Sequence, residues 1–288
     1  MTAPTVAVLV PAGELDTWRA AAFEFVRSWW ARHFPHLPLE VGTSSGSTWN
    51  KGEAIADAAR RTSADVLVLA DADSVLADPR HMSAAIGAVA AGAPWAIPHR
   101  RVYRLRADES ARLHGNPTDR PRLGHLARAA YEGVPGGGLV VVDRSAFELV
   151  RGIDPRFAGW GGEDVAFGWA LETLAGRAIR CDGQLVHLWH PHPAPTLRGS
   201  PESEALVARY RMARGLPYRM AALVAGEEWT PREQLATAVR FRLMGRRRLA
   251  RLANGELVRF DRAGFLTTTD PDLADLVRQL GDAQELPR

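Results

Sequence analysis

The sequence predicts an α/β fold in which a mostly parallel central sheet is flanked by helices. Two features predict this fold. Short apolar runs over residues 6–10 and 66–70 lack the alternation of a half-exposed strand, so they fit strands that are buried on both faces. Stretches with helical spacing, such as residues 18–33, separate these runs. Strands that alternate with helices in this way indicate a parallel sheet.

The elements of the first half can be placed in order along the chain. Pro11 ends the first apolar run. Much later in the chain, Asp143 supplies an N-terminal start for the predicted helix over residues 145–150. The predicted strands are residues 6–10, 37–41, 66–70, 94–98 and 139–142. The predicted helices are residues 18–33, 50–61, 79–91, 145–150 and 165–174.

Residues 99–132 show no clear period and are rich in arginine. We expect a long loop here, with some helix near residues 126–131. The arginines of this stretch are Arg100, Arg101, Arg104, Arg106, Arg112, Arg120, Arg122 and Arg128.

The character of the chain changes after residue 196, which divides it into two predicted parts. Residues 1–196 are expected to form the α/β domain, and residues 197–288 a mainly helical appendage. Within the appendage, helices are predicted over residues 201–214, 231–251 and 271–280, and a short strand over residues 256–260. Asp270 and Pro271 offer an N-cap and a first-turn proline to the last helix.

The composition is that of a globular protein and excludes several other classes. Of the 288 residues, 46% are hydrophobic and 24% are charged. The single cysteine, Cys181, excludes an internal disulfide framework, so a reducing, cytoplasmic location is expected. No apolar stretch has the length that a membrane span requires, so no membrane insertion is expected.

The positive charge of the chain is almost entirely arginine. The formal net charge is +3 and the pI is about 9.5, yet Lys51 is the only lysine. Two interpretations of the arginines stay open. They reflect the codon usage of a GC-rich genome, or the loop at 100–128 and the run at 246–248 form a basic surface that binds a polyanion.

An acidic pair, Asp71 and Asp73, directly follows the apolar run at 66–70. Ligands of open α/β sheets gather at the carboxyl ends of the strands. If the chain turns here, both carboxylates can reach one divalent cation, whose remaining positions suit the oxygens of a diphosphate. The alternative is an ordinary acidic turn that caps the next helix.

A second acidic motif, Trp160-Gly161-Gly162-Glu163-Asp164, is more specific. The two glycines allow the backbone to approach a ligand closely. A carboxylate held in the wall of a pocket can take a proton from an acceptor hydroxyl. The alternative role of Asp164 is an N-cap for the helix that follows it.

Three histidines, His187, His190 and His192, lie close together beyond Cys181. A neutral imidazole nitrogen is a good metal ligand, so one of them is a candidate third ligand beside the acidic pair. On a strand, residues three apart point to opposite faces, so His187 and His190 need not serve the same site. The sequence does not choose among the three.

Together these motifs resemble nucleotide-sugar glycosyltransferases of the GT-A fold, in the family 2-like group, and most closely its galactosyltransferase and N-acetylgalactosaminyltransferase branch. The resemblance covers about residues 5–193, in which the motifs occur in the family's order. The matching pieces are residues 6–11, 49–52, 71–73, 136–139, 152–157 and 160–164, and a histidine after Cys181.

The resemblance implies a role for each matched residue. The metal, Mn²⁺ or Mg²⁺, would be held on the donor diphosphate by Asp71, Asp73 and His187, with His190 as the alternative to His187. Asp164 would be the catalytic base of an inverting enzyme, and Glu163 would position the acceptor. The implied donor-binding residues are Pro11, Ala12, Lys51, Asp71, Gly136, Gly137, Gly138 and Trp160.

The expected activity is therefore the metal-dependent transfer of a sugar, from a UDP-sugar rather than another nucleoside-diphosphate sugar, to an acceptor hydroxyl. The acceptor stays open among a glycan, a small molecule, a protein and modified DNA. Residues 255–280 resemble actinobacterial phage proteins, so a phage enzyme acting on modified DNA bases is one alternative, in a bacterial or phage-infected cell. A catalytically silent nucleotide-sugar-binding module is another. A nucleotidyltransferase is disfavoured because the loop after the first strand is acidic.

Overall fold

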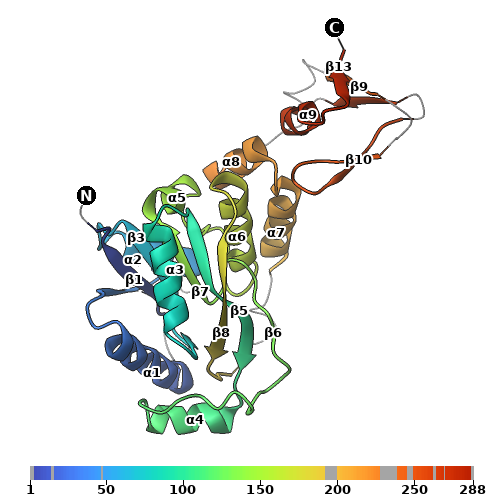
Figure 1. Cartoon of the computed structure of the whole chain (residues 1–288). Coiled ribbons are helices and arrows are strands. Elements are labelled where there is room, and N and C mark those ends of the chain that lie inside the picture. Colours follow the sequence, from blue (N-terminus) through green and yellow to red (C-terminus); the bar gives the residue numbers. More distant parts are fainter. Residues whose placement is uncertain are drawn as a thin grey trace. The chain divides into compact units, whose positions relative to one another are not determined.

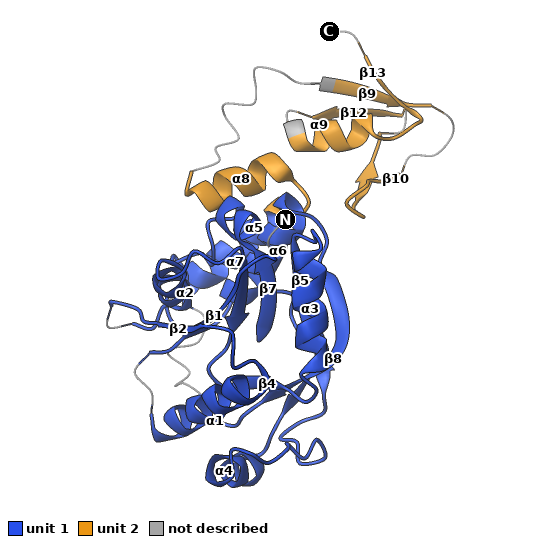
Figure 2. Ribbon diagram, turned by 60° about the vertical axis from the view of Figure 1, so that its left-hand side comes forward, with its two compact units in different colours: residues 1–212 blue, residues 213–288 orange. Residues whose placement is uncertain are grey.

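The computed structural model describes residues 3–13, 16–46, 48–191, 200–227, 239–244, 249–261, 264–268 and 270–286. The chain divides into two compact units, residues 1–212 and 213–288 (Figure 2). The boundary predicted after residue 196 lies outside the described residues. The helix α7 (Pro201–Ala213), which the sequence assigned to the appendage, falls almost wholly in the first unit.

The first unit is built on one eight-stranded sheet (Figure 1). Its strands are β1 (Val6–Pro11), β2 (Leu39–Gly42), β3 (Val66–Ala70), β4 (Ser74–Leu76), β5 (Trp95–Arg104), β6 (Tyr131–Glu132), β7 (Leu139–Asp143) and β8 (Ile179–His187). Their order is β2-β1-β3-β7-β5-β8-β4, with β6 paired to β5. The pairings make β1, β2, β3, β5 and β8 run in one direction and the other three in the opposite one.

Helices cover both faces of this sheet, as the sequence predicted. The helices are α1 (Thr17–His33), α2 (Lys51–Ala59), α3 (Arg80–Ala90), α4 (Ala107–Gly115), α5 (Arg144–Leu149) and α6 (Glu163–Leu174). Helices α1 and α3 share a core with the side chains of Val8 and Val68. Leu9 and Leu67 point to the opposite face, on which α2 packs against β1 and β2 and α5 packs against β7 and α6. Both faces of β1 and β3 are therefore buried, which explains their unbroken apolar runs. The mostly parallel α/β fold is confirmed.

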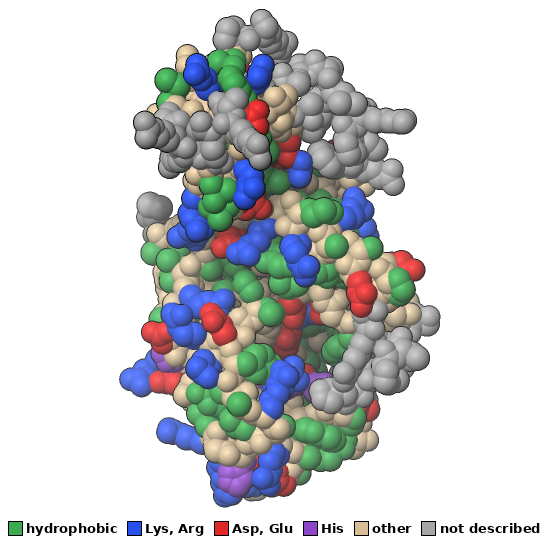
Figure 3. Space-filling model, turned by 90° about the vertical axis from the view of Figure 1, so that its right-hand side faces the viewer, with side chains coloured by type: hydrophobic (Ala, Val, Ile, Leu, Met, Phe, Trp, Pro, Cys, Tyr) green, Lys and Arg blue, Asp and Glu red, His purple; other side chains and the backbone are tan. Residues whose placement is uncertain are grey.

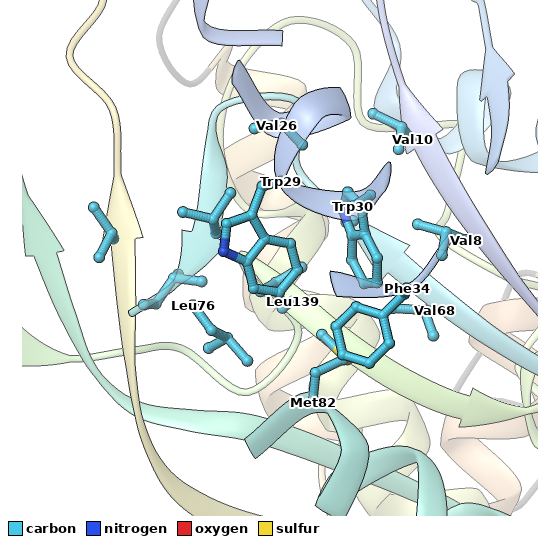
Figure 4. Packing of buried hydrophobic residues seen from close by; sticks show 14 of the residues in the cluster. Val8, Val10, Val26, Trp29, Trp30, Phe34, Val68, Leu76, Met82 and Leu139 are labelled. Atoms are coloured by element: carbon cyan, nitrogen blue, oxygen red, sulfur yellow. The ribbon is translucent and has the colours of Figure 1, made fainter. Parts of the chain in front are cut away.

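Aromatic residues of α1 fill the core on its side of the sheet. Trp29 and Trp30 are buried, with ring centroids 5.1 Å apart in an edge-to-face arrangement. Phe34 extends this cluster toward Val68 and Met82 (Figure 4). Burying a side chain of this size contributes about 2–3 kcal/mol, so α1 is firmly held on the sheet.

The arginine-rich stretch is more regular than predicted. Strand β5 continues to Arg104, helix α4 follows, and β6 pairs with β5. The helix predicted near residues 126–131 is wrong, because the helix lies at Ala107–Gly115, with acidic side chains in its first turn and basic ones in its last. Among the described residues, no helix has both the length and the apolar character needed to cross a membrane.

The second unit has its own core and mixes helices with strands. Its elements are α8 (Pro217–Ala225), β9 (Val239–Leu243), β10 (Leu249–Arg251), β11 (Leu257–Arg259), β12 (Phe265–Thr268), α9 (Pro271–Arg278) and β13 (Ala283–Glu285). The helix predicted over residues 231–251 is wrong in its described part, because Phe241 and Leu243 are buried and alternate with exposed arginines, the period of a strand. The N-cap at Asp270 is confirmed.

Candidate active site

The candidate site lies at one edge of the central sheet. Because β1, β3, β5 and β8 run in the same direction, their carboxyl ends meet there, and the antiparallel β4 and β7 begin there. This arrangement brings Asp71 and Asp73, which follow β3, to the same edge as His187, which ends β8. Figure 3 shows acidic side chains at the floor of a hollow on one face of the molecule.

Asp73, His187 and His190 form a group that can hold a metal ion. One potential ligand atom of each residue lies within 4.8 Å of the others. The Asp73 Oδ2 atom is 3.6 Å from His187 Nε2 and 3.2 Å from His190 Nε2. The loop after β8 therefore turns so that both histidines reach the same carboxylate, although they are three residues apart.

Backbone carbonyls lie beside the Nδ1 atoms of both histidines. The Nδ1 atom of His187 lies 2.7 Å from the Leu188 carbonyl oxygen, and that of His190 lies 2.8 Å from the Pro191 carbonyl oxygen. A carbonyl can only accept, so Nδ1 of His187 donates its proton and its Nε2 is left free to bind a metal. Nδ1 of His190 also lies 3.2 Å from the Arg19 Nη2 donor, and the Nε2 atom of His190 donates to Asp73 when it carries a proton. A ring nitrogen that donates to a carbonyl while the other faces the ion is typical of metal-binding histidines.

The charges in this group favour an ionised Asp73. Burial raises the pKa of Asp73, but the two histidines and a hydrogen bond from the Ser74 hydroxyl (3.0 Å) outweigh this and hold it well below its usual range. Burial lowers the pKa of His187. Burial also opposes the charge of His190, but its contact with Asp73 raises its pKa above the ordinary value.

A second group lies at the same edge and joins Asp71, Lys51 and Asp164. The Lys51 Nζ atom is 2.6 Å from Asp71 Oδ1 and 2.7 Å from Asp164 Oδ1, and only 12% of the lysine side chain is exposed. Asp71 also binds the backbone of Gly138, because its Oδ2 accepts from the Gly138 N–H at 3.2 Å. The structure thus turns Asp71 toward Lys51, whereas Asp73 belongs to the histidines.

The surroundings of Asp164 in the second group raise its pKa, whereas those of Asp73 in the first group lower its pKa. Burial raises the pKa of Asp164 to about 7, and the nearby Glu163 and Asp71 add to this while Lys51 opposes it. Three carboxylates face a single ammonium, so Lys51 does not cancel the upward shift that burial causes. Burial disfavours the charge of Lys51, but Asp164 and Asp71 more than compensate and raise its pKa well above the usual value.

Local sequence explains why these side chains meet. The Asn50 side chain caps α2 by accepting from Glu53 N and ties it to the loop before α6 by donating to the Pro155 carbonyl (2.7 Å). Gly162 precedes α6 with φ 98°, and a side chain on it would run into Val207 of α7. Gly136 lies directly against the Asp164 backbone, so a larger residue there would displace α6.

Trp160 forms a half-buried aromatic wall beside both groups. Its ring lies 6.4 Å from that of His190, nearly parallel to it, and 6.4 Å from that of Trp49. The Arg19 guanidinium lies 5.1 Å from the centre of the Trp160 ring and donates to the Pro191 carbonyl at 3.1 Å. Arg19 therefore fixes the Trp160 loop and the histidine loop to the start of α1.

The remaining predicted residues have distinct positions. Pro11 ends β1 and Ala12 pairs with the Gly42 carbonyl, at the same edge of the sheet. A side chain on Gly137 would come within 3.0 Å of the Asp164 carboxylate, so Gly137 allows the close approach of the loop before β7. Glu163 accepts from the Gly161 N–H at 3.0 Å. His192 lies outside the described residues.

Sequence reasoning missed two residues of the site, Arg19 and Ser74. Ser74 directly follows the acidic pair and is fully buried, and a hydroxyl next to a candidate metal carboxylate is the signal that could have identified it. Arg19 gave no such signal, because its local partner is Asp16 and its partners in the site, Trp160 and His190, lie more than 140 residues away in the chain.

The arginines of residues 100–128 are largely engaged within the protein. Examples are Arg100, which pairs with Asp182 at 2.6 Å, and Arg104, which donates to the Tyr131 hydroxyl at 2.9 Å. The others with such partners are Arg101, Arg106, Arg112 and Arg128. This pairing favours surface ion pairs over a free polyanion-binding surface. The arginine run at 246–248 lies outside the described residues.

Solved glycosyltransferases resemble this fold at low sequence identity. The catalytic domain of Drosophila β1,4-galactosyltransferase 7, in complex with xylobiose, is 13% identical over 92% of each chain, with a TM-score of 0.44. GalNAc-T7 with UDP, GalNAc and Mn²⁺ is 14% identical over 73% of this chain and 48% of its own, with a TM-score of 0.49. Glucosyl-3-phosphoglycerate synthase from Mycobacterium tuberculosis, with Mn²⁺, UDP-glucose and phosphoglyceric acid, is 15% identical over 79% and 82%, with a TM-score of 0.40.

A family model gives a more specific result. No curated protein is significantly similar to this chain in sequence. The model of the N-terminal domain of galactosyltransferase, however, matches residues 127–191. This segment contains the Trp160–Asp164 motif and both histidines of the metal group. Over residues 127–191, the chain is therefore similar to the N-terminal domain of galactosyltransferase.

Proposed function

We propose that the protein is a metal-dependent, inverting glycosyltransferase that moves a sugar from a nucleoside-diphosphate sugar to an acceptor hydroxyl. One observation carries this proposal. Two carboxylates of a single site are held in opposite states, Asp73 strongly acidic between two histidines and Asp164 with its pKa raised to about 7. When the environments of two carboxylates shift their pKa values in opposite directions, one suits cation binding and the other suits general acid–base catalysis.

The residues at the first group fit a divalent metal. One carboxylate and two imidazoles whose Nε2 atoms lie within 3.6 Å of it are suitable ligands for Mn²⁺ and acceptable ones for Mg²⁺ once both Nε2 atoms are deprotonated. Asp73, His187 and His190 would hold the ion, which when bound would neutralise the departing nucleoside diphosphate. Ser74 keeps the Asp73 carboxylate in place through its hydrogen bond.

Asp164 is the proposed catalytic base. A carboxylate with a pKa near 7 is a stronger base than an ordinary aspartate and is still largely ionised slightly above that pH. It takes the proton of the acceptor hydroxyl as that oxygen attacks the anomeric carbon, and the bond from that carbon to the diphosphate oxygen breaks. Attack from the face opposite the leaving group inverts the configuration.

Lys51, Trp160 and the loop before β7 would form the donor side of the site. Lys51 is the ammonium that lies against both acidic positions, and Trp160 offers a half-exposed ring on which a sugar can stack. A uridine donor is favoured by the resemblance to the galactosyltransferase family. The acceptor class is left open by the site residues.

A panel of UDP-, GDP- and dTDP-sugars tests the proposal. With Mn²⁺, at least one donor should be hydrolysed slowly in the absence of acceptor, and EDTA should stop this reaction. The D164N variant separates the enzyme from a silent binding module, because it should bind the same nucleoside diphosphate and lose turnover. Binding without any hydrolysis by the unaltered protein would contradict the proposed activity.

A further inference from the structure

Lys51 stands out in the composition of the chain as well as in the site. The sequence has 36 basic Lys and Arg residues, and all except Lys51 are arginine. This single lysine is buried between two carboxylates of the candidate site. All the remaining Lys and Arg positions of the chain hold arginine, and the single lysine side chain lies where two carboxylates meet.

The chemistry of the two cations explains why an ammonium suits this position. The Lys51 Nζ atom contacts Asp71 and Asp164 at 2.6 and 2.7 Å, and these carboxylates come from different elements. An ammonium is a compact charge with three donors on a flexible stem, so it can bridge two acceptors and exchange one for another by rotation. A guanidinium is a planar fork that binds one carboxylate with two parallel hydrogen bonds.

The bridge joins the donor side of the site to the base. Asp71 is anchored, because its N–H donates to the Gly138 carbonyl at 2.9 Å and its Oδ2 accepts from the Gly138 N–H. Asp71 is also two residues from Asp73, where the metal and the diphosphate would be bound. The flexible side chain of Lys51 can therefore turn its ammonium toward incoming phosphate oxygens while its backbone stays in α2.

The bridge also conflicts with catalysis if it persists. An oxygen of Asp164 that accepts a short hydrogen bond from an ammonium is a poor acceptor for the proton of a hydroxyl. A donor diphosphate brings negative charge to the same edge and competes for Lys51. The groups that face Lys51 are Asp71 beyond β3 and Glu163 and Asp164 at the start of α6.

We propose that Lys51 is a positioning residue that changes partners when the donor binds. In the donor-free protein it holds Asp164 and Asp71 together. When the donor binds, the Lys51 ammonium exchanges its hydrogen bond with Asp164 for one with the diphosphate. Asp164 is then free to accept the proton of the acceptor hydroxyl. This inference rests on the proposed glycosyl transfer, and it makes the base available only when a donor is present.

The single lysine allows a direct test. Protein labelled with [ε-¹³C]lysine has one lysine side-chain signal in the NMR spectrum. UDP with Mg²⁺ should move this signal in the unaltered protein. In the D164N variant the donor-free signal should already be displaced, and the change on adding UDP and Mg²⁺ should be at most about half as large. Equal changes in both proteins, or no change although calorimetry shows binding, would overturn the inference.

Kinetics provide a second test with a matched control. K51R should lower kcat at least about tenfold and change the donor KM less than about threefold, because the fork keeps its carboxylate. K51M should raise the donor KM at least about tenfold, because the diphosphate loses its counter-charge. R60K, the reverse exchange on an exposed residue beside α2, should match the unaltered protein.

The outcomes separate the two proposals. If no nucleoside diphosphate binds and no donor is hydrolysed, the proposed function fails and the inference fails with it. If donor transfer is observed but K51R retains full kcat, the lysine is only a counter-charge, and the inference alone fails. A fall in melting temperature with equal losses in kcat and kcat/KM for both Lys51 variants would indicate a structural role and would also overturn it.

Discussion

Asp73 and Asp164 are carboxylates of the same site, yet their surroundings act on them in opposite directions. Two imidazoles and a hydroxyl surround Asp73, so its charge is favoured even though it is buried. Burial raises the pKa of Asp164 to about 7, and Glu163 and Asp71 add to this rise while Lys51 opposes it. Burial acts upward on both pKa values, so the comparison teaches that the neighbours of a buried aspartate decide whether this upward shift is reversed, as at Asp73, or remains, as at Asp164.

The largest expected effect comes from removing the proposed base, Asp164. D164N should lower kcat about 1,000-fold, because an amide cannot take the acceptor proton, while the affinity for UDP changes less than about threefold. Transfer assays and calorimetry measure the two quantities. D182N, at an exposed aspartate paired with Arg100, is the matched control. Near-normal turnover in D164N would show that another group is the base.

Removing a ligand from the other member should act on the metal instead. H190A should weaken Mn²⁺ binding at least about 100-fold, because it removes an imidazole whose Nε2 atom lies 3.2 Å from Asp73 Oδ2. Activity should recover partly at high Mn²⁺ concentration. H36A, at an exposed histidine before β2, is the control. If metal affinity is the same in both variants, the ion is not held by this group.

The pH dependence of kcat/KM should reflect the ionisation of Asp164, whereas Asp73 should stay ionised over the whole pH range measured. The reaction needs the ionised form of Asp164, so kcat/KM should rise about tenfold per pH unit below pH 7 and level off above it. An ordinary aspartate would place this limb near pH 4. A flat profile between pH 5 and 8 would contradict a raised pKa at the base.

The smallest effect is expected from the hydroxyl that supports Asp73. S74A removes the 3.0 Å hydrogen bond to Oδ1 and should weaken Mn²⁺ binding about tenfold, without shifting the pH limb of kcat/KM. Titration with Mn²⁺ measures the first quantity and rate measurements the second. A shift of the pH limb in S74A would mean that the two carboxylates are coupled rather than separate.

Much of this arrangement could be predicted from the sequence, and the exceptions have physical causes. Strand β3 and its acidic end were predictable, because an apolar run that stops at a carboxylate is a local signal. The partition between Asp71 and Asp73 was not, because it depends on how the chain turns within two residues and on Lys51 from another element. The same holds for His187 and His190, whose shared site follows from the turn after β8 rather than from strand spacing.

In the second unit, the local signals were ambiguous. Arginines separated by one apolar residue can belong to a helix or to a strand, and the pairing of β9 with β12 and β13 decides for the strand. These partners lie 20 or more residues away in the chain, so tertiary contacts overrode local propensity. Asp270 was predictable because its N-cap involves only its nearest neighbours.

Helices α2 and α6 both begin at this site, with Lys51 and Glu163 as their first residues. The N-terminus of a helix carries about half a positive charge from its aligned peptide dipoles. Two such ends next to the base create a field that attracts anions and that belongs to the backbone. No side-chain substitution removes that field, which offsets part of the negative charge that Asp71, Glu163 and Asp164 bring to the same edge.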